Sequence, residues 1–514
     1  MLTTFTAPAF AKTWYIEDGD ITISASETKG TNKVSQGAEP EVEDTGTIIT
    51  NREKDASSHT VTINAGNDKV EVTLDNVNIK ADSGSALISK GDVTLTLKGD
   101  NHLTGGNGGS SSYGGDGITS SGSLTISGGT VTATGGDSTS SVGSGGSGIY
   151  SVSGDVTISG GTVNANGGDG KNGSGGGSGI DSSGGVTVSG GTVTANGGDG
   201  GSGSGSHGGN GIYSSGGVTI SSGSTVTANG GDGEDGSGGR GITSNGGVTV
   251  SGGTVNAKGG SGKNGNGGDG IRSFNPVAIS GGTVNANGGN SDYSNGGDGI
   301  RSLDHVAISG GTVKSNGGSG NLSGGNGIIS YDIDLSGSLE LTAKAGSPNG
   351  KALSRVGSEL DLNTIKDKLD PGAKVTATDA DGKVIQQVSI PRPVEPEEPS
   401  SSSDSGSATP SAPASFLPGL TVTDKDGQRI SYTSTQSGNT LTVCVGRFTA
   451  SLRISLAALR QLRAEGIETI TFQTILCSTT LSVDELLAMG GEDAEVVLTH
   501  HIRSSTLTVG GKAV

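Results

Sequence analysis

Aromatic and other hydrophobic residues are scarce in this chain of 514 residues, where Phe, Trp and Tyr make up 3% and all hydrophobic residues 29%. A globular core of ordinary thickness is therefore excluded. Any core has to be thin and built from Val, Ile, Leu and Ala. The same composition would also suit a disordered chain, so order has to be argued from regular repetition.

Cysteine and basic residues are sparse as well. The two cysteines, Cys444 and Cys477, lie close to the C-terminus, which excludes a disulfide framework for the rest of the chain. They suit either a bridge formed outside the cell or two buried free thiols. The formal net charge is -19 and no basic stripe is visible, so we expect no nucleic-acid partner.

The sequence also lacks an apolar run long enough to span a bilayer, so we expect no transmembrane segment. Its first residues, MLTTFTAPAFA, end in a small-x-small pattern before a polar segment, as the end of a secretory signal does. We therefore expect residues 1–11 to be the remnant of a signal peptide and the protein to be secreted, extracellular or at the cell surface. The alternative is a disordered N-terminus.

Glycine is the residue in excess, with 100 copies, and it follows a repeat. A Gly-Ile pair recurs every 28 to 32 residues, with the isoleucine at Ile118, Ile149, Ile180, Ile212, Ile242, Ile271, Ile300 and Ile328. One unit, residues 179–200, reads GIDSSGGVTVSGGTVTANGGDG. Its apolar residues alternate with period two, which predicts three short strands around Ile180, Val186 to Val188 and Val193 to Ala195.

Strands this short do not stand alone, so equivalent strands of successive units have to pair in parallel. The result is an all-β solenoid with three faces, in which each coil of about 30 residues adds about 4.8 Å of height. Two corners turn each coil, Ser189 to Gly191 and Asn196 to Asp199. We expect the glycines of both corners to supply positive φ angles.

The repeat pattern and the shifts in composition divide the chain. We expect a small α+β module at the C-terminus, with helices starting after Ser455 and Ser482 and a helix stop at Gly466. The expected parts are a signal remnant (1–11), an N-terminal cap (12–60), β-helix repeats (61–345), a closing cap with a hairpin turn at Asp381-Gly382 (346–386), a Pro/Ser-rich linker (387–416) and the α+β module (417–514).

The succession VTLDNVNIKADSGSALISKGDVTLTLKGDNHLTGG at residues 72–106 is followed by GI-x-S and VTISGGTVTA units. Over residues 15–345 the chain resembles the bacterial carbohydrate-binding β-helix family whose founding member is a clostridial surface protein. The resemblance implies a right-handed parallel β-helix that binds acidic plant polysaccharide or cellulose, with calcium. The chain departs from the family in its long Gly/Ser insertions, and residues 417–514 match no family of known function.

Two acidic columns are candidate Ca²⁺ ligands, because carboxylate oxygens at coil spacing suit a hard cation. The first follows the Gly-Gly pair and contains Asp137, Asp169, Asp199 and Asp232. It continues as Ser and Asn, which favours the alternative of polar turn residues that bind corner amides. The second lies two residues before the isoleucine and contains Asp269 and Asp298, but Arg240 takes the same position in another coil.

The residue directly after the isoleucine faces outward and is the candidate sugar contact. This position holds Tyr150, Tyr213, Arg272 and Arg301. The tyrosines lie two coils apart, about 9.6 Å, which is near the repeat of a β-linked disaccharide. Tyrosine rings offer flat faces to sugars, and arginines bind the carboxylates of uronic acids. The alternative is a set of unrelated surface residues.

No coil holds a local cluster of converging carboxylates distinct from the repeat, so we expect no enzymatic activity. The sequence predicts an extracellular polysaccharide-binding protein, monomeric, specific for plant cell-wall glycan of the acidic pectin-like type or cellulose, and assisted by calcium. The alternative is a structural or adhesive cell-surface repeat protein without a defined glycan ligand.

Overall fold

The computed structural model describes residues 11–391, apart from 110–111, 140–142 and 204, and residues 420–513, apart from 425–428, 431, 438, 446–448, 475–477, 490–493, 501–504 and 511. The chain divides into two compact units, residues 1–395 and 396–514. The expected signal remnant, except its last residue, and the expected linker from residue 392 onward lie outside the described residues.

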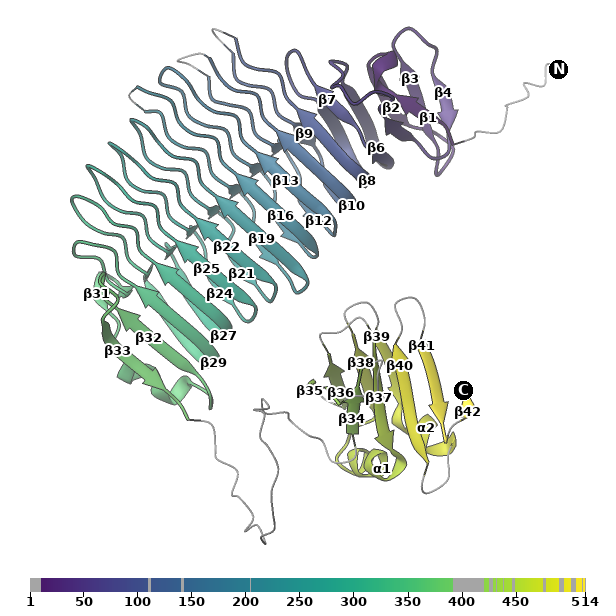
Figure 1. Ribbon diagram of the computed structural model, residues 1–514, viewed down its shortest axis with the longest axis vertical. Coiled ribbons are helices and arrows are strands. Elements are labelled where there is room, and N and C mark those ends of the chain that lie inside the picture. The colour runs from purple at the N-terminus through teal and green to yellow at the C-terminus, as the bar shows by residue number, and fades with distance from the viewer. Residues whose placement is uncertain are drawn as a thin grey trace, which may run out of the picture. The chain divides into compact units, whose positions relative to one another are not determined.

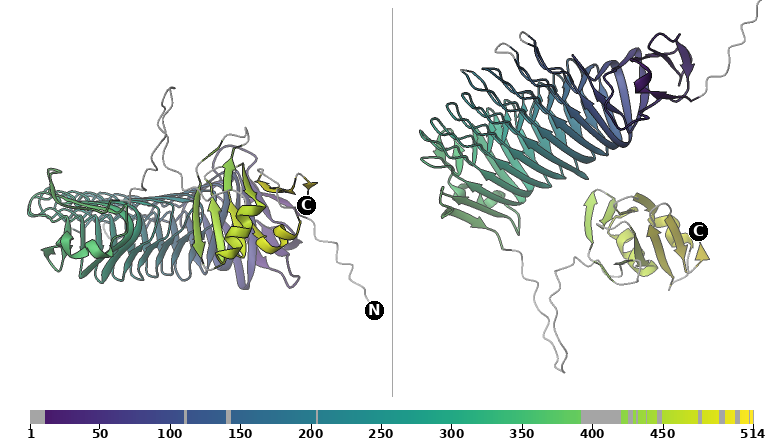
Figure 2. Two further views of the ribbon diagram at one scale, coloured as in Figure 1. Left: turned by 90° about the horizontal axis from the view of Figure 1, so that it is seen from below. Right: turned by 45° about the horizontal axis from the view of Figure 1, so that its top comes forward.

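The first unit is a parallel β-solenoid of about 12 turns (Figure 1). A central coil consists of β14 (Ile180–Ser182), β15 (Val186–Val188) and β16 (Gly191–Asn196). Each strand pairs in parallel with its equivalent in the next coil, as in the pairs Ile180 with Ile212 and Val188 with Ile220. The predicted three-strand coil and its register are confirmed, and Figure 2 shows the same stacking from two other directions.

The other coils repeat this pattern. The first-strand ladder contains β9 (Ile118–Ser121), β11 (Ile149–Ser151), β14, β17 (Ile212–Ser214), β20 (Ile242–Ser244), β23 (Ile271–Ser273), β26 (Ile300–Ser302), β28 (Ile328–Ser330) and β30 (Leu353–Arg355). The second and third ladders contain β10 (Leu124–Thr134), β12 (Val156–Ile158), β13 (Thr162–Asn166), β15, β16, β18 (Val218–Ile220), β19 (Ser224–Asn229), β21 (Val248–Val250), β22 (Thr254–Lys258), β24 (Val277–Ile279), β25 (Thr283–Asn287), β27 (His305–Asn316) and β29 (Asp332–Lys344).

The core is a set of aliphatic columns, as its composition requires. Ile180, Val188, Val193 and their equivalents are fully buried. The sequence analysis did not foresee a further inward column of serines two residues after each isoleucine. Ser214 and Ser244 are fully buried, and their hydroxyl groups donate to Gly184 O (2.8 Å) and Gly216 O (2.9 Å) of the preceding coil. These bonds satisfy the buried serine hydroxyl groups, and the same carbonyls also accept backbone hydrogen bonds from Gly216 N (2.9 Å) and Gly246 N (2.7 Å).

The Gly/Ser segments between the third strand and the next isoleucine form an ordered sheet of backbone that we call the glycine layer. Gly177 N donates to Gly168 O (2.8 Å), and Gly198 N in the following coil donates to Gly177 O (2.8 Å). This alternation continues without a break from Gly115 to Gly346. In Figure 1 the layer is the row of parallel loops along one edge of the solenoid.

The glycine layer corrects one expectation about the corners. Gly191, in the first corner, has a φ of 77°, as predicted. Gly197 and Gly198, in the second corner, are not among the residues with positive φ. They are glycines for a different reason, since a Cβ on Gly198 would lie 2.1 Å from Gly168 O. Close packing of backbone against backbone, rather than a left-handed turn, excludes side chains there.

The N-terminal end continues the coil pattern further than expected. β1 (Thr13–Tyr15) pairs in parallel with β5 (Ile48–Thr50), and β2 (Ile21–Ala25) pairs in parallel with β6 (Val61–Asp75). Only β3 (Asn32–Gln36) and β4 (Val42–Asp44) add antiparallel pairings. The remaining elements of this end are η1 (Ile16–Asp18), β7 (Asn78–Lys80) and β8 (Leu87–Thr104). The segment 12–60 is thus a coil with an antiparallel cap.

The C-terminal end closes with the predicted hairpin. β32 (Lys374–Thr378) pairs antiparallel with β33 (Val384–Ser389), preceded by β31 (Ser358–Glu359) and η2 (Leu362–Lys368). β33 reaches Ser389 and buries Val388. Residues 387–389 therefore belong to the cap, whereas we had expected the linker to begin at residue 387. The last residues of β33 were missed because they directly precede the Pro-rich segment and were assigned to the linker together with it.

The second unit has the expected α+β character. α1 (Leu456–Ala464) begins after Ser455, whose hydroxyl oxygen accepts a hydrogen bond from Ala458 N (3.2 Å), and α2 (Val483–Met489) follows Ser482. One sheet contains β34 (Leu420–Thr423), β37 (Ala450–Ser455), β40 (Glu495–His500), β41 (Ser505–Val509) and β42 (Lys512–Ala513). The other contains β35 (Thr433–Ser437), β36 (Thr440–Cys444), β38 (Thr469–Gln473) and β39 (Ser478–Ser482).

Cys444 lies on β36, and its Sγ lies 3.5 Å from Gln473 Oε1. Cys477 lies outside the described residues, so the choice between a bridge and two thiols stays open. Among the helices of the described part, none has the length and apolar character to cross a membrane.

Candidate functional site

Two outward columns run side by side where the glycine layer joins the first-strand ladder. The pre-isoleucine column is the position two residues before each isoleucine, and the post-isoleucine column is the position directly after it. Because these positions are three residues apart, their side chains meet within one coil. In the coil of β26, Arg301 Nη1 lies 3.2 Å from Asp298 Oδ2.

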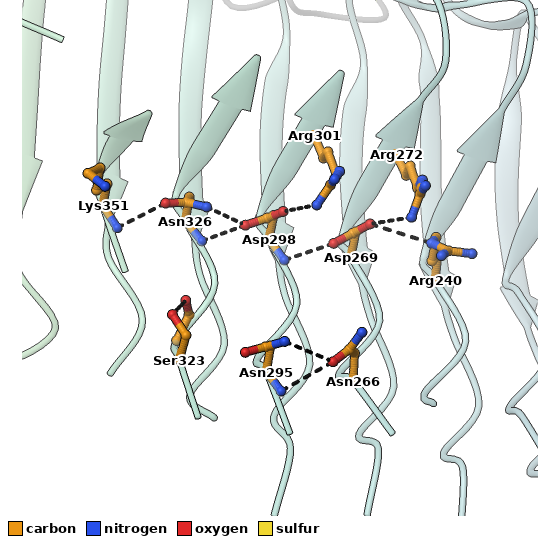
Figure 3. A network of polar contacts seen from close by, with 11 residues as sticks. Arg240, Asn266, Asp269, Arg272, Asn295, Asp298, Arg301, Ser323, Asn326 and Lys351 are labelled. Atoms are coloured by element: carbon orange, nitrogen blue, oxygen red, sulfur yellow. Dashed lines mark hydrogen bonds and ion pairs between the residues drawn. The ribbon is translucent and has the colours of Figure 1, made fainter. Parts of the chain in front are cut away.

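Toward the C-terminal end of the solenoid these columns line a groove of about 280 Å³, which we call the arginine groove. Figure 3 shows its charged side chains and the amides beside them. The polar side chains that line it are Ser237, Arg240, Asn266, Asp269, Arg272, Asn295, Asp298, Arg301, Ser323 and Asn326. Three arginines from three successive coils therefore surround two aspartates, which leaves one positive charge in excess.

The backbone holds the two aspartates in place. Asp298 N donates to Asp269 Oδ1 (2.9 Å), and Asn326 N donates to Asp298 Oδ1 (2.6 Å). Lys351 N continues the ladder by donating to Asn326 Oδ1 (3.0 Å). One oxygen of each carboxylate is thus used to pair with the next coil, and the other oxygen, Oδ2, is directed toward the arginines (Figure 3).

The arginines neutralise these buried carboxylates only in part. Asp269 Oδ2 lies 3.4 Å from Arg240 Nε and 3.7 Å from Arg272 Nη1. Burial and, after it, the charge of Asp269 raise the pKa of Asp298, while Arg301 opposes the rise. Burial and the charge of Arg240 lower the pKa of Arg272, which stays protonated because arginine is protonated at any ordinary pH.

Each of the three arginines also keeps a buried Nε without a hydrogen-bond partner. The side chain of Arg240 is 36% exposed to solvent, that of Arg272 22% and that of Arg301 37%. The guanidinium groups are therefore partly desolvated, partly paired and still open to the groove. Charged groups in this state bind an incoming anion more strongly than fully hydrated ones do, because less water has to be removed.

The predicted sugar contacts share one column, but the structure divides them into two pairs. Tyr150 and Tyr213 lie two coils apart with Asp181 between them, as expected. Both rings are half-buried, and the Tyr213 hydroxyl accepts a hydrogen bond from Asn245 Nδ2 (3.2 Å). Arg272 and Arg301 are neighbours in register, and they line the arginine groove, whereas the tyrosines do not.

The corner aspartates form a backbone ladder of their own. Asp169 N donates to Asp137 Oδ1 (3.0 Å), Asp199 N to Asp169 Oδ1 (2.9 Å) and Asp232 N to Asp199 Oδ1 (2.7 Å). This is the arrangement of turn residues that bind corner amides, and Ser261 N continues it by donating to Asp232 Oδ1.

The expectation of calcium at the two acidic columns stays a prediction. Within the described parts of the chain, no three His, Cys, Asp or Glu side chains are grouped so that they could hold a metal ion. Asp269 and Asp298 face guanidinium groups, which supply the positive charge that these carboxylates need. The function proposed below does not depend on calcium.

Sequence reasoning missed two features of this face. Arg240 was considered only as a residue that cannot bind calcium. Its place in the same column as Asp269, one coil earlier, already indicated an ion pair between the two side chains. Asp116 and Asp181 were also missed as an interacting pair, and the charge of Asp116 contributes to a raised pKa of Asp181. Asp116 and Asp181 lie in different columns, whose lateral order was not evident from spacing alone.

The fold and the site together define a parallel β-helix repeat protein with a charged groove on its first-strand face. A family model described as a beta helix repeat matches residues 124–148, 156–178, 186–210 and 277–300, which are segments of the solenoid. No curated protein and no solved structure matches the chain.

Proposed function

We propose that this chain binds an acidic polysaccharide outside the cell, with the polymer lying along the first-strand face. The observation that carries the proposal is the convergence of three arginines on one groove in a chain whose net charge is -19. A local excess of positive charge attracts an anionic ligand.

Arginine suits the carboxylates of uronic acids because its planar fork donates two parallel hydrogen bonds. Arg272 and Arg301 lie one coil apart in one column, so they meet successive positions of a chain that runs along the solenoid axis. Tyr150 and Tyr213 continue the same column and offer ring faces for stacking further along the polymer. The ligand class is therefore a linear uronate polymer of the pectin type.

The test compares two double variants with the parent by affinity electrophoresis in polygalacturonate and by pull-down on insoluble cellulose. Arg272→Ala with Arg301→Ala should weaken retention in polygalacturonate about a hundredfold or more, because charge-assisted hydrogen bonds contribute about 1.5–3 kcal/mol each and at least two are lost. Retention on cellulose should not change. Tyr150→Ala with Tyr213→Ala should weaken binding by a smaller factor, since stacking contributes about 1 kcal/mol per ring.

The matched control is Lys366→Ala with Lys374→Ala, which removes two positive charges from the closing cap. If the arginine variant is folded and binds polygalacturonate as the parent does, the groove is not the site. The proposal is for binding without cleavage, so incubation with polygalacturonate should release no new reducing ends.

The second candidate is a structural or adhesive repeat protein without a defined glycan ligand. It is favoured by the third-strand face, where the uncharged amides of Asn166, Asn196 and Asn229 stack in three successive coils. Asn196 Nδ2 donates to Asn166 Oδ1 (2.9 Å), and Asn229 Nδ2 donates to Asn196 Oδ1 (2.9 Å). Such ladders stiffen the coil stack and need no ligand. A parent protein that binds neither polymer would favour this candidate.

A further inference from the structure

A second hollow of about 190 Å³ adjoins the arginine groove, and the two share Arg301. We call it the apolar hollow. It is lined by Arg301, Ser302, Leu303, Ile329, Ser330, Tyr331, Val356 and Gly357. The lining thus changes from guanidinium groups and amides to aliphatic and aromatic side chains within a single coil.

The register shows that the two sites follow one another along the same line. Arg272 pairs with Arg301, and Arg301 pairs with Ile329. A polymer that runs along the post-isoleucine column therefore meets two arginines and then an isoleucine. At the isoleucine a free carboxylate would lose water without gaining a cation, which is unfavourable.

The apolar side chains of the hollow are more exposed than folding requires. Tyr331 is 66% exposed and Val356 is 69% exposed, and Leu303 and Ile329 are half-buried. Arg301 is the only charged residue in the lining, and Asp298 already faces it from the groove. The hollow therefore offers contact area to an uncharged group of modest size.

Val356 adds an independent observation. Its φ is 49°, a left-handed conformation that β-branched residues rarely adopt, and Gly357 follows with a φ of 80°. Asn or Gly would fit this turn with less strain. A valine that is both strained and exposed does not contribute to folding, and strain of this kind is found at sites where a side chain contacts a ligand.

We propose that the apolar hollow binds an esterified uronate unit next to free uronate units, so that the protein recognises a partly methyl-esterified polyuronate. This proposal rests on the function proposed above. The free carboxylates lie over the arginines of the groove, and the methyl ester lies against Ile329, Tyr331 and Val356. The pattern of charged and neutral units along the polymer matches the order of the side chains along the column.

The test uses one pectin of intermediate methyl esterification and the same pectin after saponification, both immobilised, with the full chain in solution. The parent should bind the esterified polymer about fourfold more tightly for each ester group seated in the hollow, which is the factor expected for burying one methyl group. Tyr331→Ser with Val356→Asn should abolish this preference and leave binding to the saponified polymer unchanged.

Two further variants keep the test decisive. Val356→Asn alone should raise the melting temperature, because it relieves the backbone strain of the turn. It should still reduce the preference for the esterified polymer. A variant that lost binding through misfolding would have a lower melting temperature instead. Val152→Ser is the matched control, since this valine is also exposed (45%) and follows the corresponding strand of an earlier coil. It should leave both affinities unchanged.

Failure of this proposal is distinguishable from failure of the proposed function. If the parent binds both polymers equally, or if the hollow variants lose both affinities alike, the ester preference is overturned while binding through the groove stands. If the parent binds neither polymer, the proposed function itself is wrong.

Discussion

Asp181 shows how one residue of the post-isoleucine column is affected by its surroundings. Burial and, after it, the charge of Asp116 raise its pKa to about 6, and a hydrogen bond from Ser178 opposes the rise. The folded chain therefore binds this proton more tightly than the unfolded chain does. The contribution to stability is complete below about pH 4 and is lost as the pH rises through about 6.

Asp181→Asn should accordingly raise the melting temperature at pH 8 and change it little at pH 4, because the amide never carries the buried charge. Thermal melts of variant and parent at both pH values check this. Asp68→Asn, at an exposed position of β6, is the control and should show no such difference. An equal effect of Asp181→Asn at the two pH values would contradict the assignment.

At the scale of elements, the glycine layer explains why so much glycine is compatible with an ordered structure. Each of its backbone segments approaches the next so closely that even a methyl group collides. A Cβ on Gly209 would lie 1.8 Å from Gly177 O, whereas a Cβ on Gly160, in the first corner, would meet nothing within 4 Å. The layer is held by hydrogen bonds between glycines rather than by side chains.

Gly198→Ala should therefore destabilise the solenoid by about 1–3 kcal/mol, the range for adding a methyl group to a packed interior. Gly160→Ala should be close to neutral and is the matched control. Chemical denaturation followed by circular dichroism measures both. Equal stability of the two variants would mean that the layer is not packed as described.

The strand ladders could be predicted from the sequence because period-two alternation and the Gly-Ile spacing fix both the faces and the register. The isoleucine column was placed correctly, since Ile180 pairs with Ile212 and Ile242 pairs with Ile271. The glycine layer could not be predicted from the sequence. A glycine that is required for a positive φ angle and a glycine that is packed against a carbonyl of the next coil are the same letter. The arginine groove was predicted in part, through Arg272 and Arg301.

The rest of the groove depends on contacts between columns. Arg240 faces Asp269 because the two residues take the same position in successive coils that stack in register. Arg301 faces Asp298 because positions three residues apart meet within one coil. The expectation of calcium at Asp269 and Asp298 was based on each column alone, and it stays a prediction. Once both columns are seen together, the arginines account for the carboxylates.

At the scale of the whole molecule, the solenoid is a long regular support that carries a local site. The serine and aliphatic columns repeat along the central coils with little change, while the charged residues of the pre- and post-isoleucine columns differ from coil to coil. The repeated residues maintain the fold, and the variable ones distinguish one part of the face from another. A linear polymer bound lengthwise would contact several coils, so its affinity would accumulate over many weak contacts.

A crystal structure of the chain with an oligomer of galacturonic acid tests the central claim most directly, with EDTA present to exclude calcium bridging. The account predicts uronate carboxylate oxygens about 2.7–2.9 Å from guanidinium nitrogens of Arg272 and Arg301, with the sugar chain running parallel to the solenoid axis. An oligomer bound at another face, or bound only when calcium is restored, would contradict it.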